Sequence, residues 1–246
     1  MSPVRVACVG DSNTEGFRGW APPSPNNFPA LMQRLLGDEF EVVNLGSSGA
    51  TLQQVHSDAY WHREVFRKFV GQSWDVVVIN LGTNDAKMKS SGAEVDHWRG
   101  GEAFASDYST LIKLARTLGN PQPSIFVATS VPCLSDGTFG LSQSIINEVL
   151  PPLVRGIARE HSAHLVDTFE ALGGPAAPEV YFRDESWCDQ VHPCDRGFMR
   201  MAEVTADAIQ RHHASPPAAS SHLSPFALLA TVVAVAVVGA VVLRWL

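Results

Sequence analysis

The sequence has little positive charge and few cysteines. Its 246 residues include 18 Lys and Arg against 25 Asp and Glu, which gives a formal net charge of -7. A nucleic-acid-binding protein needs a basic surface to neutralise phosphates, so this balance argues against nucleic acid as a partner. Four cysteines are too few for a disulfide framework in a chain of this length. Whether Cys188 and Cys194 pair stays open.

Signals for cofactors, metals and secretion are also missing. The chain contains neither the Gly-x-Gly-x-x-Gly pattern nor the P-loop lysine of nucleotide-binding proteins, and its histidines lack a metal-ligand spacing such as His-Glu-x-x-His. We therefore expect no cofactor and no metal. The N-terminus has no basic segment followed by an apolar run, and no Asn-x-Ser/Thr acceptor occurs. We expect the N-terminal domain to face the cytosol.

One long apolar run is present, at residues 225–246. It carries no charge before Arg244, is apolar on all sides, and as a helix is about long enough to cross a ~30 Å hydrocarbon core. Residues 214–224, rich in Pro, Ala and Ser, are typical of a linker. The small residues also resemble a GPI-attachment signal, but that route requires prior secretion. We predict a folded domain over 1–213 and a single-pass C-terminal membrane anchor.

Apolar, β-branched runs alternate with helical patterns over residues 1–213. Continuous rather than alternating hydrophobicity is typical of strands covered on both faces. Three of the helical patterns end in Gly, which is a normal helix stop. The sequence therefore predicts an α/β fold with a five-stranded parallel sheet between helical layers. The predicted strands are 4–9, 40–45, 75–81, 124–130 and 164–169.

Four polar motifs lie where such a sheet binds its ligands, at the carboxyl ends of the strands. Ser12, in the first motif, is either a small residue that suits a tight turn or a nucleophile. A nucleophilic serine needs a base and a third group that orients the base. His192 is the candidate base, and Asp189, three residues earlier, is the candidate orienting group. The motifs are GDSNTEG (10–16), GSSGAT (46–51), GTND (82–85) and DQVHP (189–193).

Ester hydrolysis also needs hydrogen-bond donors for the oxyanion of the tetrahedral intermediate. The candidates are the backbone N–H groups of Ser12 and Gly49 and the side-chain amide of Asn84, each after a different strand. Gly49 suits a close backbone approach because it has no Cβ. We predict supporting roles for Asp11, which bonds N–H groups of its own turn, and for Asp85, which holds Asn84.

In this order the four motifs resemble the blocks of the SGNH, or GDSL, hydrolase superfamily, with Asn13 in place of the usual leucine. The resemblance runs from Val4 to about Ile209. The stretches VVNLGSSGATL, DVVVINLGTNDAK and DHW are most similar to the carbohydrate-esterase and sialate O-acetylesterase-like branch. The resemblance implies a flavodoxin-like three-layer αβα fold without metal. It also implies a catalytic triad of Ser12, Asp189 and His192 and an oxyanion hole of Ser12, Gly49 and Asn84.

The predicted protein is a membrane-tethered serine esterase whose hydrolase domain spans 1–213. The branch resemblance favours O-acetyl groups on carbohydrate as the small-molecule ester substrate, whereas a membrane anchor favours lysophospholipids or acyl thioesters. A catalytically silent binding module is the alternative of another class, although such a module has no need of both His192 and Asp189.

Two further features bear on substrate binding. The segment 86–104 exceeds a typical connection and is a candidate substrate-side loop. Four aromatic residues either line the mouth above Ser12 or pack within their loops. They are Trp20, Trp61, Trp98 and Phe139.

Overall fold

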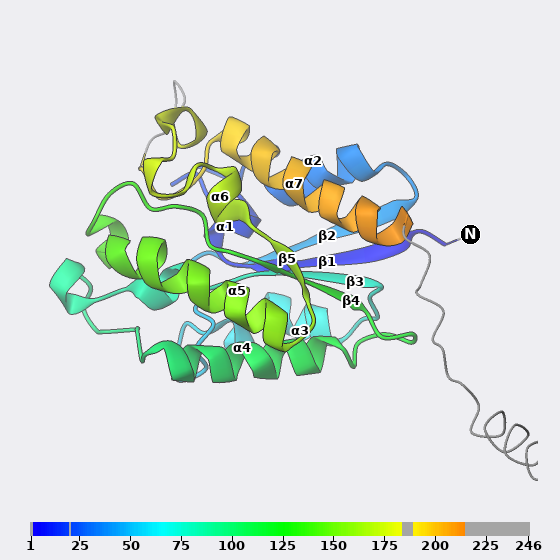
Figure 1. Cartoon of the computed structure of the whole chain (residues 1–246), viewed down its shortest axis with the longest axis horizontal. Helices are drawn as coiled ribbons and strands as arrows, with labels where there is room; N and C mark the ends of the chain where they lie inside the picture. Colours follow the sequence, from blue (N-terminus) through cyan, green and yellow to red (C-terminus); the bar gives the residue numbers. More distant parts are fainter. Residues whose placement is uncertain (1, 20, 184–188, 215–246) are drawn as a thin grey trace, which may run out of the picture. The chain divides into compact units, whose positions relative to one another are not determined.

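Five parallel strands form the sheet of the computed structural model, which describes residues 2–19, 21–183 and 189–214 (Figure 1). Their order is β2-β1-β3-β4-β5, the flavodoxin-like order. The strand order reverses between β1 and β3, because β2 is added on one side of β1 and β3 on the other. The predicted five-stranded parallel sheet is confirmed. The strands are β1 (Val4–Gly10), β2 (Phe40–Gly46), β3 (Val76–Asn80), β4 (Ser124–Ala128) and β5 (His164–Val166).

Helices cover both faces of the sheet, with α2 and α7 on one side and α3, α4 and α5 on the other (Figure 1). The helices are α1 (Ser12–Glu15), α2 (Phe28–Leu36), α3 (Glu64–Val70), α4 (Gly101–Ala115), α5 (Leu150–Glu160), α6 (Thr168–Ala171) and α7 (Asp195–Ala214). Single turns of tighter helix are η1 (Tyr60–His62), η2 (Thr83–Ala86), η3 (Lys89–Ser91), η4 (Thr138–Gly140), η6 (Gly174–Ala176) and η7 (Glu179–Tyr181), and η5 (Ile145–Val149) is a π-helix.

Each face of the sheet has its own apolar core, because successive strand residues point to opposite faces. Val6 and Cys8 of β1 pack toward α2 and α7, whereas Ala7 and Val9 pack toward α3, α4 and α5. All four are fully buried. The continuous apolar run of β1 is therefore explained by burial on both sides, as predicted.

The last predicted strand is too long. Instead of running over 164–169 it ends at Val166, since the Asp167 side chain accepts a hydrogen bond from the backbone N–H of Glu170 and caps α6. The cap satisfies a free helical N–H group and turns the chain out of the sheet.

The sequence also predicts a linker and a membrane helix at the C-terminal end of the chain. The compact unit that carries the sheet ends at Arg211. Within the described residues, no helix combines the length and the apolar character that a membrane span requires. The predicted membrane helix at 225–246 lies outside the described residues, as do nearly all of the linker, Trp20 and Cys188. The three described cysteines, Cys8, Cys133 and Cys194, are all buried free thiols.

Candidate active site

Three of the four motifs meet because their strands are neighbours in register. Gly10 at the end of β1 pairs with Gly46 at the end of β2 and with Asn80 at the end of β3. The turns that follow these residues therefore leave the same edge of the sheet, where parallel sheets bind their ligands. Ser12 follows β1 and Asn84 follows β3, so both residues lie at this edge of the sheet and line the same pocket.

The turn that carries Ser12 is tight and braced. A Cβ at Gly10 would lie 1.9 Å from Thr14 Oγ1 and 2.8 Å from the Asn80 carbonyl oxygen, so only glycine fits there. Helix α1 begins at Ser12, and the Asp11 side chain caps it by accepting a hydrogen bond from Asn13 N at 2.9 Å. This is the bracing geometry predicted for Asp11. Burial raises its pKa to about 6, against the opposing effect of the Asn13 N–H group.

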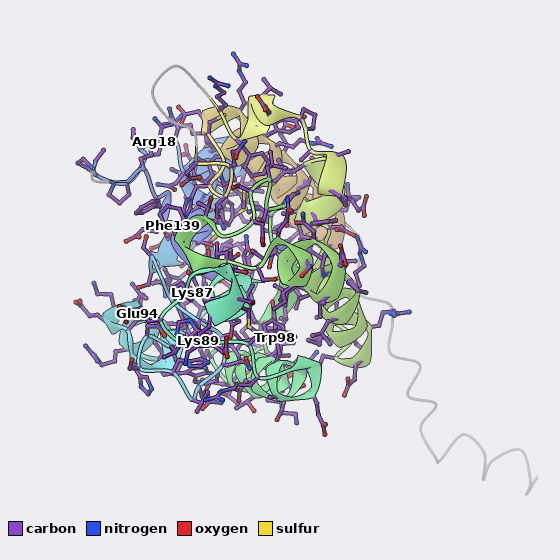
Figure 2. All side chains as sticks on the ribbon, turned by 90° about the vertical axis from the view of Figure 1, so that its left-hand side faces the viewer. Arg18, Lys87, Lys89, Glu94, Trp98 and Phe139 are labelled. Atoms are coloured by element: carbon purple, nitrogen blue, oxygen red, sulfur yellow. The ribbon has the colours of Figure 1, made fainter. Side chains whose placement is uncertain are left out.

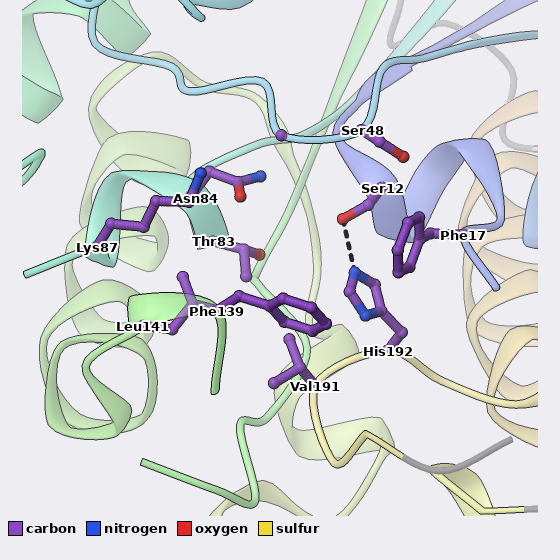
Figure 3. Close-up of a pocket in the computed structure, with 11 residues that line it drawn as sticks. Ser12, Phe17, Ser48, Thr83, Asn84, Lys87, Phe139, Leu141, Val191 and His192 are labelled. Carbon is purple, nitrogen blue, oxygen red and sulfur yellow. Dashed lines mark hydrogen bonds between the residues drawn. The ribbon is translucent and has the colours of Figure 1, made fainter. Parts of the chain in front are cut away.

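Ser12, His192 and Asp189 form a continuous chain of hydrogen bonds. His192 Nε2 lies 2.9 Å from Ser12 Oγ (Figure 3), and His192 Nδ1 lies 2.6 Å from Asp189 Oδ2. The other carboxylate oxygen of Asp189 accepts the backbone N–H groups of Val191 and His192 at 2.9 and 2.8 Å. The loop therefore folds back on Asp189, as its spacing predicted. This is the arrangement of a serine nucleophile, its base and the group that orients the base.

The surroundings hold the imidazole in place and keep its partner ionised. Burial alone would raise the pKa of Asp189, but the hydrogen bonds and charge of His192 and the backbone N–H of Val191 hold it below its ordinary value. The rings of Phe17 and Phe139 flank the His192 ring, with centroid separations of 4.5 and 5.5 Å (Figure 3). An ionised Asp189 fixes the tautomer in which Nδ1 carries the proton and Nε2 accepts from Ser12.

The residues predicted to supply oxyanion donors, Ser12, Gly49 and Asn84, line one pocket. The Asn84 amide nitrogen donates one hydrogen to the Ala50 carbonyl oxygen at 3.2 Å, which fixes the side chain and leaves its second hydrogen for a ligand. Figure 3 shows the amide reaching toward Ser12. Among the described residues, the backbone N–H groups of Ser12 and Gly49 donate to no protein acceptor. The residues that carry these three donors all line the same pocket.

The need for glycine at position 49 comes from its backbone. Its φ is +77°, in the left-handed region, while a Cβ there would meet only Arg63 Nη2 at 3.8 Å, an ordinary contact. The close backbone approach to a ligand expected from the sequence stays a prediction.

Asp85 links two parts of the donor set. It follows Asn84 in η2, and its two carboxylate oxygens accept the backbone N–H groups of Leu52 and Gln53, each at 2.8 Å. These bonds tie the turn of Asn84 to the loop that carries Gly49, the supporting role predicted for Asp85. Burial raises the pKa of Asp85 to about 7, although both hydrogen bonds oppose the rise.

Ser12 opens into a cavity of about 300 Å³. This volume is at the small end of the range for ligand sites, about 300 to 1,000 Å³. Its walls are mostly apolar, and the only charged side chain among the described residues that line it is Lys87. The lining residues are Ser12, Phe17, Ser48, Gly49, Thr83, Asn84, Lys87, Phe139, Leu141, Val191 and His192 (Figure 3). The described residues contain no group of three or more His, Cys, Asp or Glu that could hold a metal ion.

The sequence matches the GDSL-like lipase/acylhydrolase family over residues 8–200. The chain belongs to this family. The predicted class, a GDSL-type hydrolase, is thereby confirmed, and the four motifs that carried the resemblance lie within the matched segment.

Relatives of this GDSL-family chain include an acetylxylan esterase from Xylanibacter ruminicola, which is 27% identical over an alignment of 223 residues. The match covers 84% of this chain and 43% of the relative. This chain therefore spans less than half the length of that relative. Two solved structures share the fold, each over 85% of this chain and 99% of the other. They are a carbohydrate acetylesterase from Sinorhizobium meliloti (TM-score 0.66, 19% identity) and an M. smegmatis aryl esterase (TM-score 0.66, 18% identity).

Of the aromatic residues considered for the mouth of this GDSL-family site, only Phe139 lines the pocket among those described. Trp61 donates to the Leu52 carbonyl oxygen at 2.8 Å, and Trp98 packs beside Phe104 with ring centroids 5.6 Å apart. Both therefore serve loop packing, the second of the two interpretations.

Sequence reasoning missed several wall residues of the pocket. Phe17 directly follows the first motif and Lys87 lies two residues after the third, so proximity to a motif was the available signal. Val191 lies within the fourth motif, so the same signal applied to it. Leu141 is an apolar loop residue, and nothing in its pattern separates it from core residues.

Proposed function

We propose that this chain is a serine esterase that removes small acyl groups, chiefly O-acetyl groups of carbohydrate. The observation that carries the proposal is the hydrogen-bonded chain of Ser12, His192 and Asp189, of which Ser12 and His192 line a cavity of about 300 Å³. A turn serine without a catalytic role has no need of an imidazole at 2.9 Å that is itself oriented by a carboxylate.

The reaction begins when Ser12 Oγ attacks the ester carbonyl carbon and His192 Nε2 takes the hydroxyl proton. Asp189 remains ionised and stabilises the imidazolium that forms. The carbonyl oxygen becomes an oxyanion, which accepts hydrogen bonds from the backbone N–H groups of Ser12 and Gly49 and from the Asn84 amide. One such donor is worth roughly 3 to 4 kcal/mol in the transition state.

Collapse of this intermediate breaks the bond to the alcohol oxygen, and His192 passes its proton to the departing alkoxide. The acyl group is then held on Ser12 Oγ as an ester. His192 next takes a proton from water, which attacks the acyl carbon, and the second intermediate releases the carboxylic acid. The proton returns to Ser12 and the site is restored.

The size of the cavity and the relatives support a short acyl group. Apolar walls suit an acetyl methyl group, while a volume of about 300 Å³ leaves little room for a long chain beside the alcohol. An acetylxylan esterase and a carbohydrate acetylesterase stand among the similar proteins, which supports carbohydrate acetates as the substrate class. Lysophospholipids and acyl thioesters are the competing substrates.

We also propose that residues 225–246 tether the enzyme to a membrane, with the catalytic domain in the cytosol. The support for this tether is the apolar sequence of the segment, which carries no charge before Arg244. Fractionation of cells that produce the full chain, compared with a chain ending at residue 214, tests it. Recovery of both in the same soluble fraction would contradict the tether.

Acyl-chain selectivity tests the substrate class. The full chain in mild detergent is assayed with p-nitrophenyl esters from acetate to palmitate and with an acetylated methyl xylopyranoside. We expect kcat/KM to be highest for acetate and to fall at least about tenfold by octanoate, because an acyl chain too long for a cavity of about 300 Å³ enters it only by displacing the walls. A kcat/KM that rises toward palmitate would support the lipid substrates instead.

A further inference from the structure

Two loops meet beside the catalytic pocket and lock together. Lys87 and Leu141 form an isolated antiparallel bridge, and Met88 N donates to the Gly140 carbonyl oxygen at 2.9 Å. A Cβ at Gly140 would lie 2.8 Å from atoms of Ala93, so the two backbones are in direct contact. Because backbone contacts set this junction, its shape exists before any ligand binds.

A second cavity, of about 330 Å³, lies at this junction. It shares two walls with the catalytic pocket, since Lys87 and Phe139 line both. Figure 2 shows these two residues in the middle of the same face, with Glu94 beside Lys87. The second cavity is therefore the immediate neighbour of the catalytic pocket, on the side of Lys87 and Phe139.

The two cavities differ in chemistry. Phe17, Leu141 and Val191 make much of the catalytic pocket apolar, whereas the second cavity brings together the ammonium of Lys87, the carboxylate of Glu94 and the ring of His97. Lys87 supplies only donors and Glu94 only acceptors. A hydroxyl group both donates and accepts, so a hydroxyl-rich ligand can satisfy both side chains, while an alkyl chain would remove both charges from water without compensation.

The charge of this cavity favours a neutral ligand. Lys87 Nζ lies 3.8 Å from Asp58 Oδ2, which already balances much of its charge, and Glu94 adds a negative charge on the same cavity. An anionic sugar would meet the Glu94 carboxylate beside an ammonium whose charge Asp58 already balances in large part. A phosphate or uronate unit is therefore disfavoured relative to a neutral one.

Phe139 supplies the apolar surface between the cavities. The residue is 51% exposed, and its φ of +55° lies in the left-handed region, which is uncommon for a bulky residue. Neither property strengthens the core, and backbone strain of this kind persists at ligand-binding positions. The exposed ring offers an apolar face that suits the C–H face of a sugar ring.

We propose that the cavity lined by Lys87, Glu94 and Phe139 binds the alcohol half of the ester, and that this half is a neutral, hydroxyl-rich unit such as a pyranose ring. Lys87 and Glu94 hydrogen-bond its hydroxyls, and Phe139 covers its C–H face. The inference rests on the proposed esterase function, because it assigns the leaving-group side of that reaction.

The test compares two acetate esters with the full chain in detergent. One is an acetylated methyl xylopyranoside, and the other is p-nitrophenyl acetate, whose alcohol carries no further hydroxyl. In Glu94→Ala we expect the ratio of kcat/KM for the sugar ester to that for the aryl ester to fall about tenfold, mainly through KM, because a hydrogen bond to a charged group is lost. Glu160→Ala is the matched control, since Glu160 is an exposed residue at the end of α5.

The outcomes separate the two proposals. A ratio within twofold of the wild-type value in Glu94→Ala, with Ser12-dependent hydrolysis of both esters, would overturn the sugar site and leave the esterase standing. If the wild type hydrolysed neither ester through Ser12, both the esterase and the sugar site would be overturned. As a second readout, free methyl xylopyranoside should inhibit aryl-acetate hydrolysis in the wild type and about tenfold more weakly in Glu94→Ala.

Discussion

Replacing Asp189 with Asn tests how the loop of His192 controls its imidazole. In the wild type one Asp189 oxygen accepts the backbone N–H groups of Val191 and His192, and the other lies 2.6 Å from His192 Nδ1. In Asp189→Asn the amide oxygen keeps the two backbone bonds, so the loop stays folded, but the amide nitrogen faces Nδ1. The imidazole then carries its proton on Nε2 and donates to Ser12 instead of accepting from it.

We expect Asp189→Asn to lower kcat about 10⁴-fold, the effect of the same change in a serine-protease triad, which corresponds to about 5 kcal/mol of transition-state stabilisation. Initial rates with p-nitrophenyl acetate measure the loss, and thermal unfolding verifies that the fold is kept. The control is Asp38→Asn, an exposed aspartate after α2. A loss smaller than tenfold in a folded variant would refute the orienting role of Asp189.

Three further predictions concern the Asn84 oxyanion donor, the pH dependence of activity and the buried acid Asp85. Asn84→Ala should lower kcat about 10² to 10³-fold with little change in KM, because the donor acts on the transition state. Steady-state kinetics measure both constants, and a change in KM alone would contradict this role. A histidine base acts only in its neutral form, so activity should rise from acid toward neutral pH, and Asp189, whose pKa is lowered, should stay ionised over that rise. A flat profile would exclude a histidine base. Asp85 has a pKa of about 7 when folded and 3.8 as its ordinary value, so its contribution to stability is full below pH 3.8 and is lost as the pH rises through 7. The free energy of unfolding of the wild type relative to Asp85→Asn should therefore fall over this window, by a few kcal/mol in urea denaturation; a constant difference would count against the raised pKa.

The sheet and the main site residues could be predicted because each depends on local pattern. Burial on both faces makes β1 a continuous apolar run, and Asp189 lies three residues before His192, close enough to fold back within one turn. Parallel strands then bring the ends of β1 and β3 together. The error at 164–169 arose where a local capping bond of Asp167 ended the strand, which apolar character alone does not reveal.

The rest of the site depends on how distant loops meet. Lys87 and Phe139 are 52 positions apart, and they share two cavities only because their loops bridge each other. Phe17 is similarly defined by its contact with His192, 175 positions away. Hydrophobic periodicity carries no information about such contacts, so the pocket walls had to come from the structure.

Hydrolysis of p-nitrophenyl acetate by the full chain and by its Ser12→Ala variant is the most direct test of the esterase. We predict measurable turnover by the wild type and a loss of about 10⁶-fold in kcat in the variant, as when the nucleophile of a triad is removed. Thermal unfolding of both proteins verifies that the turn after β1 is intact. A folded Ser12→Ala variant that retained more than a tenth of the wild-type rate would contradict Ser12 as the nucleophile.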